Sequence, residues 1–238
     1  LIIIKMKNIS LVLPVFNEKK SLLYVIKSWH QFLIKQNIKH EFVICEDGST
    51  DGTKELVQEL KEKYPISDQS SKERLGYGGG VTRGIKASKF EYILCIDSDG
   101  QCMPNSFMKF YNCEKEKDII IGNRNPRRDP RLRIIYSKLL KVYHDLLFNS
   151  KITDPSCPYV FAKKNIYLEL LPKLSYVKEA YWWGFIGAAI MLKKKIIEYD
   201  IEHFERYDGS SVVYKFSKMP GIIFRNLLGL LRLKRSFS

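Results

Sequence analysis

The feature of this sequence that constrains the fold most is a series of short apolar runs, each followed at once by polar or glycine-rich residues. The runs are residues 9–13, 41–45, 92–96 and 118–122. Apolar residues recur at helical spacing over 21–36, and Thr50-Asp51 is typical of a helix start. Strands that alternate with helices predict an α/β fold with a mostly parallel central sheet. Ligands of such sheets bind beyond the carboxyl ends of the strands, so we expect the chemistry in the polar stretches.

The second half of the chain predicts more helix and less regular structure. We expect a helix over Arg133–Phe148 and a short strand over Tyr159–Ala162. The apolar run from Tyr181 to Leu192, 12 residues long, is too short to cross a bilayer.

The end of the chain has the pattern of an amphipathic helix over Gly221–Leu233. Lys218, Arg225, Gly229 and Arg232 fall on one helical face, and leucines occupy the rest. We expect this segment to contact a membrane surface. Packing on the main domain or at a dimer interface is the alternative.

Composition excludes several classes of protein. Of the 238 residues, 45% are hydrophobic and 28% are charged, which is typical of a globular domain and not of a disordered or fibrous chain. The five cysteines form no C-x-x-C pair, which argues against a disulfide scaffold or zinc site and favours reduced thiols in the cytosol. Leu1–Ile4 is too short for the apolar core of a secretory signal.

The net charge of +14 is regional. Residues 124–141 hold seven basic side chains and one acid, and residues from 215 onward hold six basic side chains and no acid. Nucleic acid, nucleotide phosphates and anionic lipid are all suitable partners for such charge. Acidic residues after the strands would repel phosphate wherever no metal lies between, so we do not expect a nucleic-acid partner.

Two aspartates directly follow the apolar run 92–96. Asp97 and Asp99 stand at i and i+2, so both carboxylates can reach one divalent cation that bridges the oxygens of a diphosphate. Gln101 offers a neutral oxygen to the same ion. Taken alone the D-x-D pattern is weak, because turns are rich in Asp for backbone reasons.

Taken together, the strand-end motifs are specific. They are P-V-F-N-E at 14–18, E-D-G-S-T-D-G at 46–52, G-Y-G-G-G-V-T-R-G at 76–84, D-S-D-G-Q at 97–101, G-N-R at 122–124 and R-x-x-G-x-S from Arg206. In this order they resemble glycosyltransferase family 2, the inverting nucleotide-sugar enzymes with the Rossmann-like GT-A fold. Within that family the chain looks most like the dolichyl- and polyprenyl-phosphate sugar transferases. The resemblance implies a catalytic domain over 6–211, followed by the basic amphipathic segment 212–238.

The resemblance also implies roles for individual residues. A donor linked to UDP or GDP would be bound by Pro14, Asn17, Glu18, Asp47, Gly76, Gly79, Asp97 and Ser210, with Asp47 on the base. The implied ligands of Mg²⁺ or Mn²⁺ are Asp97, Asp99 and Gln101, and the implied catalytic set is Asp99, Arg124, Arg206 and Asp154. Arg124 and Arg206 would grip phosphates, because a guanidinium offers a bidentate donor fork. For Asp51 we expect a helix cap instead of a ligand role.

The alternatives to these roles are structural. Residues 76–84 would otherwise be a flexible loop, and Asp47-Gly48 a turn. For the arginines that follow Arg124, at 127, 128, 131 and 133, a solvated basic surface that attracts an anionic membrane is expected.

The chain departs from the family pattern at D-P-S-C-P-Y, 154–159, where an Asp followed by Gly-Phe-Arg is usual. The role of Asp154 therefore stays open, and we expect Cys157 to be a buried thiol and not a nucleophile. The run 181–192 lacks the carboxylate that many relatives place there, and Glu179 is the nearest candidate.

A phosphate acceptor is anionic near neutral pH and needs no general base, whereas a hydroxyl acceptor does. We therefore expect sugar transfer to polyprenyl phosphate by a peripheral protein at the cytoplasmic face of the cell membrane, with a membrane protein as a possible partner. The alternative is the same donor chemistry with a hydroxyl acceptor on a lipid-linked glycan or cell-surface polysaccharide.

Overall fold

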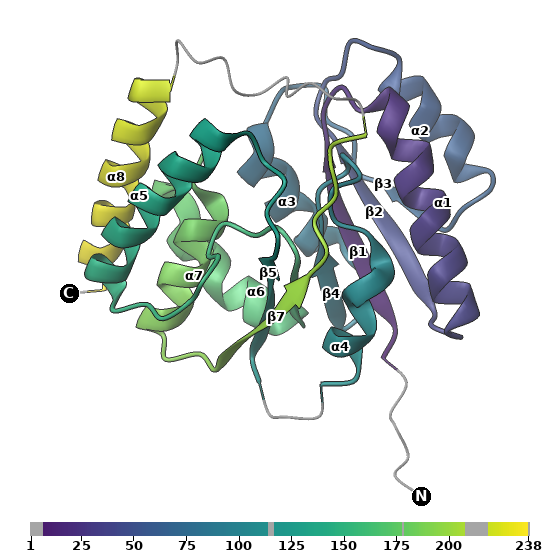
Figure 1. The fold of residues 1–238 in the computed structure, drawn as a ribbon. Coiled ribbons are helices and arrows are strands. Elements are labelled where there is room, and N and C mark those ends of the chain that lie inside the picture. The colour runs from purple at the N-terminus through teal and green to yellow at the C-terminus, as the bar shows by residue number, and fades with distance from the viewer. Residues whose placement is uncertain (1–6, 114–116, 178, 208–218, 238) are drawn as a thin grey trace, which may run out of the picture.

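The computed structural model describes residues 7–113, 117–177, 179–207 and 219–237. A seven-stranded sheet runs through the middle of the molecule in the order β3-β2-β1-β4-β6-β5-β7 (Figure 1). The strands are β1 (Ile9–Val15), β2 (His40–Glu46), β3 (Ile66–Asp68), β4 (Tyr92–Cys95), β5 (Ile119–Arg124), β6 (Val160–Lys163) and β7 (Ile196–Ile201). Among the strands of the described residues, only β6 runs antiparallel to its neighbours, β4 and β5, and the other pairings are parallel. The predicted α/β fold with a mostly parallel sheet is confirmed.

Helices cover both faces of the sheet. They are α1 (Lys19–Lys35), α2 (Thr53–Lys61), α3 (Gly76–Ala87), α4 (Phe107–Tyr111), α5 (Arg131–Phe148), α6 (Lys164–Leu170), α7 (Tyr181–Met191) and α8 (Met219–Arg235), with short 3₁₀ turns η1 (Pro104–Ser106) and η2 (Leu171–Tyr176). On one face, Trp29 of α1 is fully buried and packs edge-on against Phe107 of α4, with ring centroids 5.5 Å apart. On the other face, Tyr167 of α6 packs against Phe185 of α7, at 5.2 Å.

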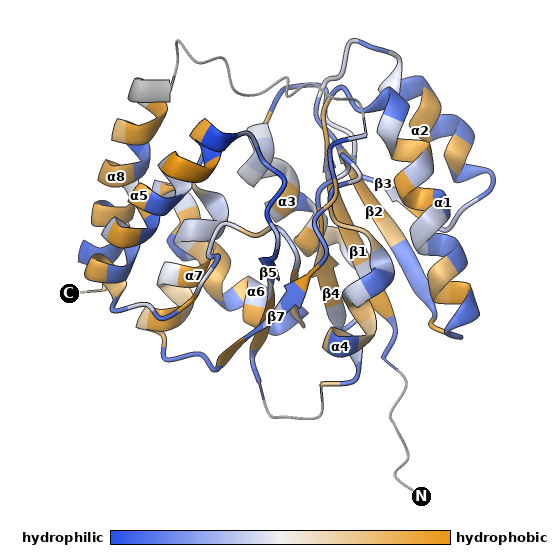
Figure 2. Cartoon of the chain, in the orientation of Figure 1, coloured by the Kyte–Doolittle hydropathy of each residue, from blue (hydrophilic) through white to orange (hydrophobic). Residues whose placement is uncertain are grey.

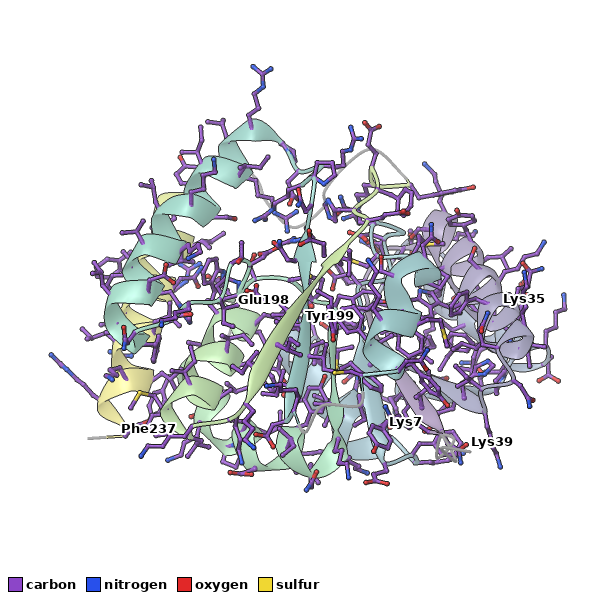
Figure 3. All side chains as sticks on the ribbon, turned by 60° about the horizontal axis from the view of Figure 1, so that its bottom comes forward. Lys7, Lys35, Lys39, Glu198, Tyr199 and Phe237 are labelled. Atoms are coloured by element: carbon purple, nitrogen blue, oxygen red, sulfur yellow. The ribbon has the colours of Figure 1, made fainter. Side chains whose placement is uncertain are left out.

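The structure decides one open alternative and differs from the sequence prediction in two places. The glycine-rich stretch 76–84, for which a flexible loop was the alternative, forms most of α3, and Gly84 lets this helix pack tightly onto the sheet: a Cβ on Gly84 would meet Val12 of β1 at 2.5 Å. Helix α2 begins at Thr53, and Asp51 accepts hydrogen bonds from the N–H groups of Thr53 and Lys19. Strand β7 was not predicted. It forms one edge of the sheet, where Glu198 and Tyr199 are labelled in Figure 3.

Helices α5 and α8 lie side by side at one end of the molecule (Figure 1). Hydrophobic and hydrophilic bands alternate along both helices in Figure 2, and basic residues are among the hydrophilic positions. Helix α8 packs on α7, α5 and η2, with Leu230 and Leu233 fully buried. The amphipathic helix expected here is thus present, and the part of its apolar face that contains Leu230 and Leu233 is buried against the protein. The expected boundary at 211/212 lies outside the described residues.

Candidate active site

The carboxyl ends of the parallel strands open into a cavity of about 1820 Å³. It has three regions. The acidic part contains Glu18, Asp47, Asp97 and Asp99, and the arginine cluster contains Arg124, Arg127 and Arg133. The third region, the apolar arm, contains Leu139, Leu140, Tyr143, Leu171, Leu174, Trp183, Ile222, Ile223 and Leu227. Pro14, Gly76, Gly79 and Arg206 also line the cavity, so most of the residues predicted for the site meet there.

Asp97 and Asp99 follow β4 and point into the acidic part. Asp97 accepts a hydrogen bond from the hydroxyl of Tyr77 at 2.8 Å, and Asp99 accepts one from the N–H of Gln101 at 3.1 Å. Burial, and then the neighbouring Asp99 carboxylate, raise the pKa of Asp97 to about 7. A carboxyl in this state gains from a nearby cation, because positive charge favours its ionised form.

Arg206 lies on the segment that follows β7 and reaches across to the acidic part. Its Nη2 forms an ion pair with Oε1 of Glu18, and its Nη1 lies 3.4 Å from Oδ2 of Asp99. Glu18 also accepts a hydrogen bond from the hydroxyl of Ser21 at 2.7 Å. Burial raises the pKa of Glu18, and the hydrogen bond from Ser21 and the charge of Arg206 partly offset it. Arg206 therefore supplies a positive charge beside the D-x-D pair.

Asp47 lies at the start of α3 instead of pointing freely into the cavity. Its two oxygens accept hydrogen bonds from the N–H groups of Leu75, at 2.7 Å, and Gly76, at 2.8 Å. Gly76 has a φ of +72°, a backbone conformation that favours glycine. A Cβ on Gly79 would lie 2.7 Å from the Cβ of Leu75, so the start of α3 needs glycines for its close packing.

Two of the predicted donor or metal residues, Asn17 and Gln101, are not among the residues that line the cavity. The side chain of Asn17 accepts a hydrogen bond from the N–H of Thr50 at 2.8 Å and so holds two strand-end loops together. The amide of Gln101 donates to the carbonyl of Phe204 at 3.2 Å, away from the two aspartates. Ser210 lies outside the described residues.

Asp154 forms a bidentate ion pair with Arg124, and neither is a freely accessible group. The Nε and Nη2 atoms of Arg124 donate to Asp154 at 2.7 and 2.9 Å, and both side chains are less than 10% exposed. Burial alone would raise the pKa of Asp154, but its hydrogen bonds and ion pair with Arg124 lower it to about 2. A carboxylate with so low a pKa is a weak general base, so its contacts suit an anchor for the arginine.

The sequence reading missed the rest of the arginine cluster. Asp129, 1% exposed in its side chain, lies 2.5 Å from Arg127, 3.0 Å from Arg133 and 3.6 Å from Arg124. Arg127 and Arg133 were expected on a solvated basic surface, but they line the cavity. The run of basic residues at 124–133 was the sequence signal for this cluster. The three guanidinium groups lie together because each is paired with the buried carboxylate of Asp129.

The apolar arm also went unrecognised from the sequence. Tyr143 of α5 donates its hydroxyl hydrogen to the carbonyl of Leu227 of α8 at 3.1 Å, so the two helices are tied together beside the arm. Glu179, the candidate carboxylate, pairs with Arg225 of α8 at 2.8 Å. Cys157 is fully buried, and burial raises the pKa of its thiol to about 12, consistent with the expected inert role.

Asp97 and Asp99 fit a Mg²⁺ or Mn²⁺ ion by the chemistry of their oxygens. Across residues 7–207 and 219–237, apart from the gaps in the description, no group of three or more His, Cys, Asp or Glu side chains suitable for a metal ion is present. Two carboxylates suit an ion that takes its other ligands from a diphosphate and water, which is how Mg²⁺ is usually held beside nucleotides.

The chain belongs to glycosyl transferase family 2, since the model of that family matches residues 10–171. This confirms the family predicted from the strand-end motifs. The chain is 27% identical to dolichyl-phosphate beta-glucosyltransferase of Dictyostelium discoideum over 252 aligned positions, which cover 95% of this chain and 77% of that relative. It is 31% identical to dolichol-phosphate mannosyltransferase of Pyrococcus furiosus over 118 residues, which cover 49% of this chain and 33% of that relative.

Solved structures share the fold. Glucosyl-3-phosphoglycerate synthase from Mycobacterium tuberculosis, in complex with Mn²⁺, uridine-diphosphate and phosphoglyceric acid, superposes with a TM-score of 0.69 at 18% identity. The match covers 96% of this chain and 78% of that protein. The predicted GT-A fold is thereby confirmed, and the protein is a glycosyltransferase. None of the helices among the described residues combines the length and the apolar character required to span a membrane.

Proposed function

We propose that this glycosyltransferase moves a sugar from a nucleotide-sugar donor to polyprenyl phosphate at a membrane surface, with inversion at the anomeric carbon. One observation carries the proposal: the acidic part, the arginine cluster and the apolar arm belong to one cavity. The acidic part suits a nucleoside diphosphate with its cation, the arginine cluster suits a phosphate monoester, and the apolar arm suits a prenyl chain. Relatives named for dolichyl phosphate support the same acceptor class.

On the donor side, Pro14, Glu18 and the start of α3 would hold the nucleotide, and Asp47 would accept from the base. Asp97 and Asp99 would hold Mg²⁺ or Mn²⁺, and a related structure contains Mn²⁺ together with uridine-diphosphate. When bound, the ion would neutralise charge that develops on the departing nucleoside diphosphate. Gln101 remains a predicted ligand, although its amide group now contacts Phe204.

On the acceptor side, the arginine cluster would bind the phosphate. Arg124 is held by Asp154 and is 4% exposed in its side chain, whereas the side chains of Arg127 and Arg133 are 16% and 39% exposed and so are more accessible to a ligand. Three arginines against Asp129 and Asp154 leave a formal charge of +1 (3 − 2). That residual charge is what a phosphate monoester would neutralise.

The partners of the carboxylates favour a phosphate acceptor over a hydroxyl. Every Asp or Glu that lines the cavity, among the residues described, already has a hydrogen-bond or ion-pair partner: Glu18 and Asp99 with Arg206, Asp47 with backbone N–H groups, Asp97 with Tyr77, and Glu179 with Arg225. Asp154 is a weak base because of Arg124. A phosphate oxygen is already anionic and attacks the anomeric carbon without losing a proton.

Helix α5 supports the membrane part of the proposal. Its exposed apolar residues follow one another at intervals of three or four: Leu132 (48% exposed), Ile135 (51%), Leu139 (64%), Val142 (60%) and Leu146 (82%). This set is called the α5 stripe, and Arg131, Lys138 and Lys141 accompany it. Leu139 belongs to both the stripe and the apolar arm, so a prenyl chain could pass from the bilayer directly into the cavity.

The test measures radiolabel transferred from a panel of UDP- and GDP-sugars into organic-extractable lipid, with Mg²⁺ or Mn²⁺ and polyprenyl phosphate present. We expect transfer that requires the metal, with a loss of at least a hundredfold in Asp99→Asn. Asp200→Asn is the matched control, because Asp200 is an exposed β7 residue that contacts two asparagines outside the cavity.

The acceptor is tested in parallel with geranyl phosphate, 3-phosphoglycerate and a lipid-linked glycan. Geranyl phosphate should accept sugar less well than the polyprenyl substrate, and 3-phosphoglycerate should not accept it. Efficient transfer to 3-phosphoglycerate would show that the apolar arm has no role in acceptor choice. Transfer only to the hydroxyls of the glycan, lost in Asp154→Asn with nucleotide binding intact, would replace the proposal with the hydroxyl-acceptor alternative.

A further inference from the structure

Two consecutive hydrogen bonds connect α7 to the first aspartate of the D-x-D pair. The indole Nε1–H of Trp182 donates to the hydroxyl oxygen of Tyr77 at 2.7 Å, and that hydroxyl donates to Oδ1 of Asp97 at 2.8 Å. All three side chains line the cavity. Tyr77 lies at the start of α3 and Trp182 at the start of α7, so the connection joins elements about a hundred positions apart in the chain.

When Asp97 is ionised, as it is beside a cation, the direction of both hydrogen bonds is fixed by chemistry. An indole nitrogen can only donate, so the oxygen of Tyr77 must be the acceptor of the first bond. The phenol has a single hydrogen, which is then free for Asp97 alone. Oδ1 of Asp97 is therefore occupied by Tyr77, and Oδ2 is the oxygen that remains for a donor-bound cation.

Both ends of the connection are held in place. Trp182 is 5% exposed, and its ring packs edge-on against Tyr181, at 5.1 Å, and Phe185, at 5.5 Å. Tyr77 directly follows Gly76, whose N–H donates to Asp47. A carboxylate that is held by a fixed partner loses less conformational entropy when it binds a cation.

We propose that Tyr77 and Trp182 are positioning residues that hold the carboxylate of Asp97 with Oδ2 turned to the cation of the nucleotide-sugar donor. The inference rests on the donor site proposed above, and it assigns a role to two aromatic residues outside the D-x-D pair. Trp182 is adjacent in α7 to Trp183, which lines the apolar arm, so the orientation of Asp97 depends on the same helix that borders the proposed acceptor region.

The experiment is calorimetric titration of the full chain with UDP, and separately with GDP, at fixed Mn²⁺. For whichever nucleotide the unmodified protein binds, we expect about tenfold weaker affinity in Tyr77→Phe, as is common when a partner of a metal ligand is removed. Trp182→Phe should weaken binding two- to threefold, since the phenol keeps its bond to Asp97 but loses its fixed direction. The double variant should bind no more weakly than Tyr77→Phe, because both residues act through one hydroxyl.

Tyr199→Phe is the matched control. Tyr199 lies on the edge strand β7, where Figure 3 labels it, and is not among the residues that line the cavity; its hydroxyl contacts Sγ of Cys113 at 3.6 Å. Nucleotide affinity should be unchanged in this variant. Circular-dichroism melting curves of all four variants show that the comparison is made between folded proteins.

Steady-state kinetics separate positioning from a merely structural role. Tyr77→Phe should raise KM for the nucleotide sugar and leave KM for the acceptor unchanged, whereas partial unfolding would lower kcat and change neither KM. Nucleotide affinities in Tyr77→Phe and Trp182→Phe within twofold of the unmodified protein would overturn the inference while leaving the proposed function intact. Failure of the unmodified protein to bind either nucleotide with Mn²⁺ would overturn both. If Tyr77→Phe loses nucleotide affinity as expected but the unmodified protein transfers no sugar to polyprenyl phosphate, only the proposed acceptor would be contradicted.

Discussion

Helices α5 and α8 are similar in sequence character and opposite in environment. Each is 17 or 18 residues long, rich in leucine and isoleucine, and basic. Helix α8 buries Leu230 and Leu233 completely, and Gly229 lies against the backbone of η2. In contrast, α5 buries only His144 and Phe148 and exposes the five apolar residues of the α5 stripe.

The comparison shows what an amphipathic pattern does and does not determine. The pattern indicates that an apolar face is covered, because exposed stripes of this kind are costly in water. It does not say whether the cover is the protein itself or something outside it. The sequence assigned the outside contact to the last helix, while the exposed stripe lies on α5.

The largest expected difference between the helices is in the cost of a polar substitution. Leu233→Asn in α8 should lower the free energy of unfolding by about 4 kcal/mol, because it removes a buried apolar side chain and buries an amide. Leu146→Asn in α5, at a position 82% exposed, should change it by less than about 0.5 kcal/mol. Urea unfolding measures both. Similar losses in the two variants would mean that α5 is also covered within the folded protein.

The buried side of α5 leads to a prediction about how the free energy of unfolding depends on pH. Burial lowers the pKa of His144 from 6.5 to about 4, and its Nε2 hydrogen-bonds the carbonyl of Trp183 at 3.0 Å. Below pH 6.5, His144 therefore binds a proton in the unfolded chain but stays neutral in the folded protein. The free energy of unfolding consequently falls between pH 6.5 and about 4. The shift corresponds to a loss on the order of 3 kcal/mol.

Unfolding measured from pH 7.5 to 4 checks this value. His203 contributes a change of the same sign, because burial also lowers its pKa to about 4. His144→Phe should therefore reduce the slope without abolishing it. A slope that is identical in this variant and in the unmodified protein would show that His144 accepts its proton normally in the folded state.

Two glycines of α8 provide a further comparison. A Cβ on Gly229 would lie 2.5 Å from the carbonyl oxygen of Tyr176, so Gly229→Ala should cost about 2 kcal/mol as α8 moves away from η2. Gly221→Ala meets only the end of the Arg225 side chain, at 3.3 Å, and should be neutral or stabilising by up to about 1 kcal/mol through helix propensity. The melting temperatures of the two variants measure the difference. Equal effects would contradict the close packing of α8.

Much of the proposed donor half could be predicted from the sequence, because its signals are local. An apolar run followed by Asp97 and Asp99 defines a strand and its polar end within a few residues, and the same holds for Asp47 after β2. The local signal at 76–84 was ambiguous, because five glycines also suit a flexible loop, whereas in the structure Gly84 allows α3 to approach the sheet closely.

The proposed acceptor half was less predictable, because the roles of its residues depend on partners that are distant in the sequence. Asp129 was one acid among seven basic residues until the fold placed three arginines around it. Asp154 was a candidate base in the sequence, but in the structure it is paired with Arg124, which lies 30 positions earlier in the chain. Likewise, nothing near Trp182 in the sequence points to Tyr77, 105 positions away.

The smallest expected effect decides which helix contacts lipid. Ile135→Asn combined with Leu146→Asn should weaken binding to vesicles containing anionic lipid about tenfold, since two exposed apolar side chains are removed. Phe224→Asn, at the exposed apolar position of α8, should change binding less than twofold. Sedimentation with sucrose-loaded vesicles at low and at 0.5 M salt measures the apolar and the electrostatic contributions, because salt screens Arg131, Lys138 and Lys141.

Each alternative to lipid contact through α5 has its own result in that assay. A larger effect of Phe224→Asn than of the α5 variant would return the membrane contact to the last helix, as the sequence first indicated. The intervals of three and four in the α5 stripe also suit a helix–helix seam between two copies of the chain. In that case the α5 variant would convert a dimer to a monomer in analytical ultracentrifugation and leave vesicle binding unchanged. Weaker vesicle binding with no change in oligomeric state would leave the bilayer as the cover of α5.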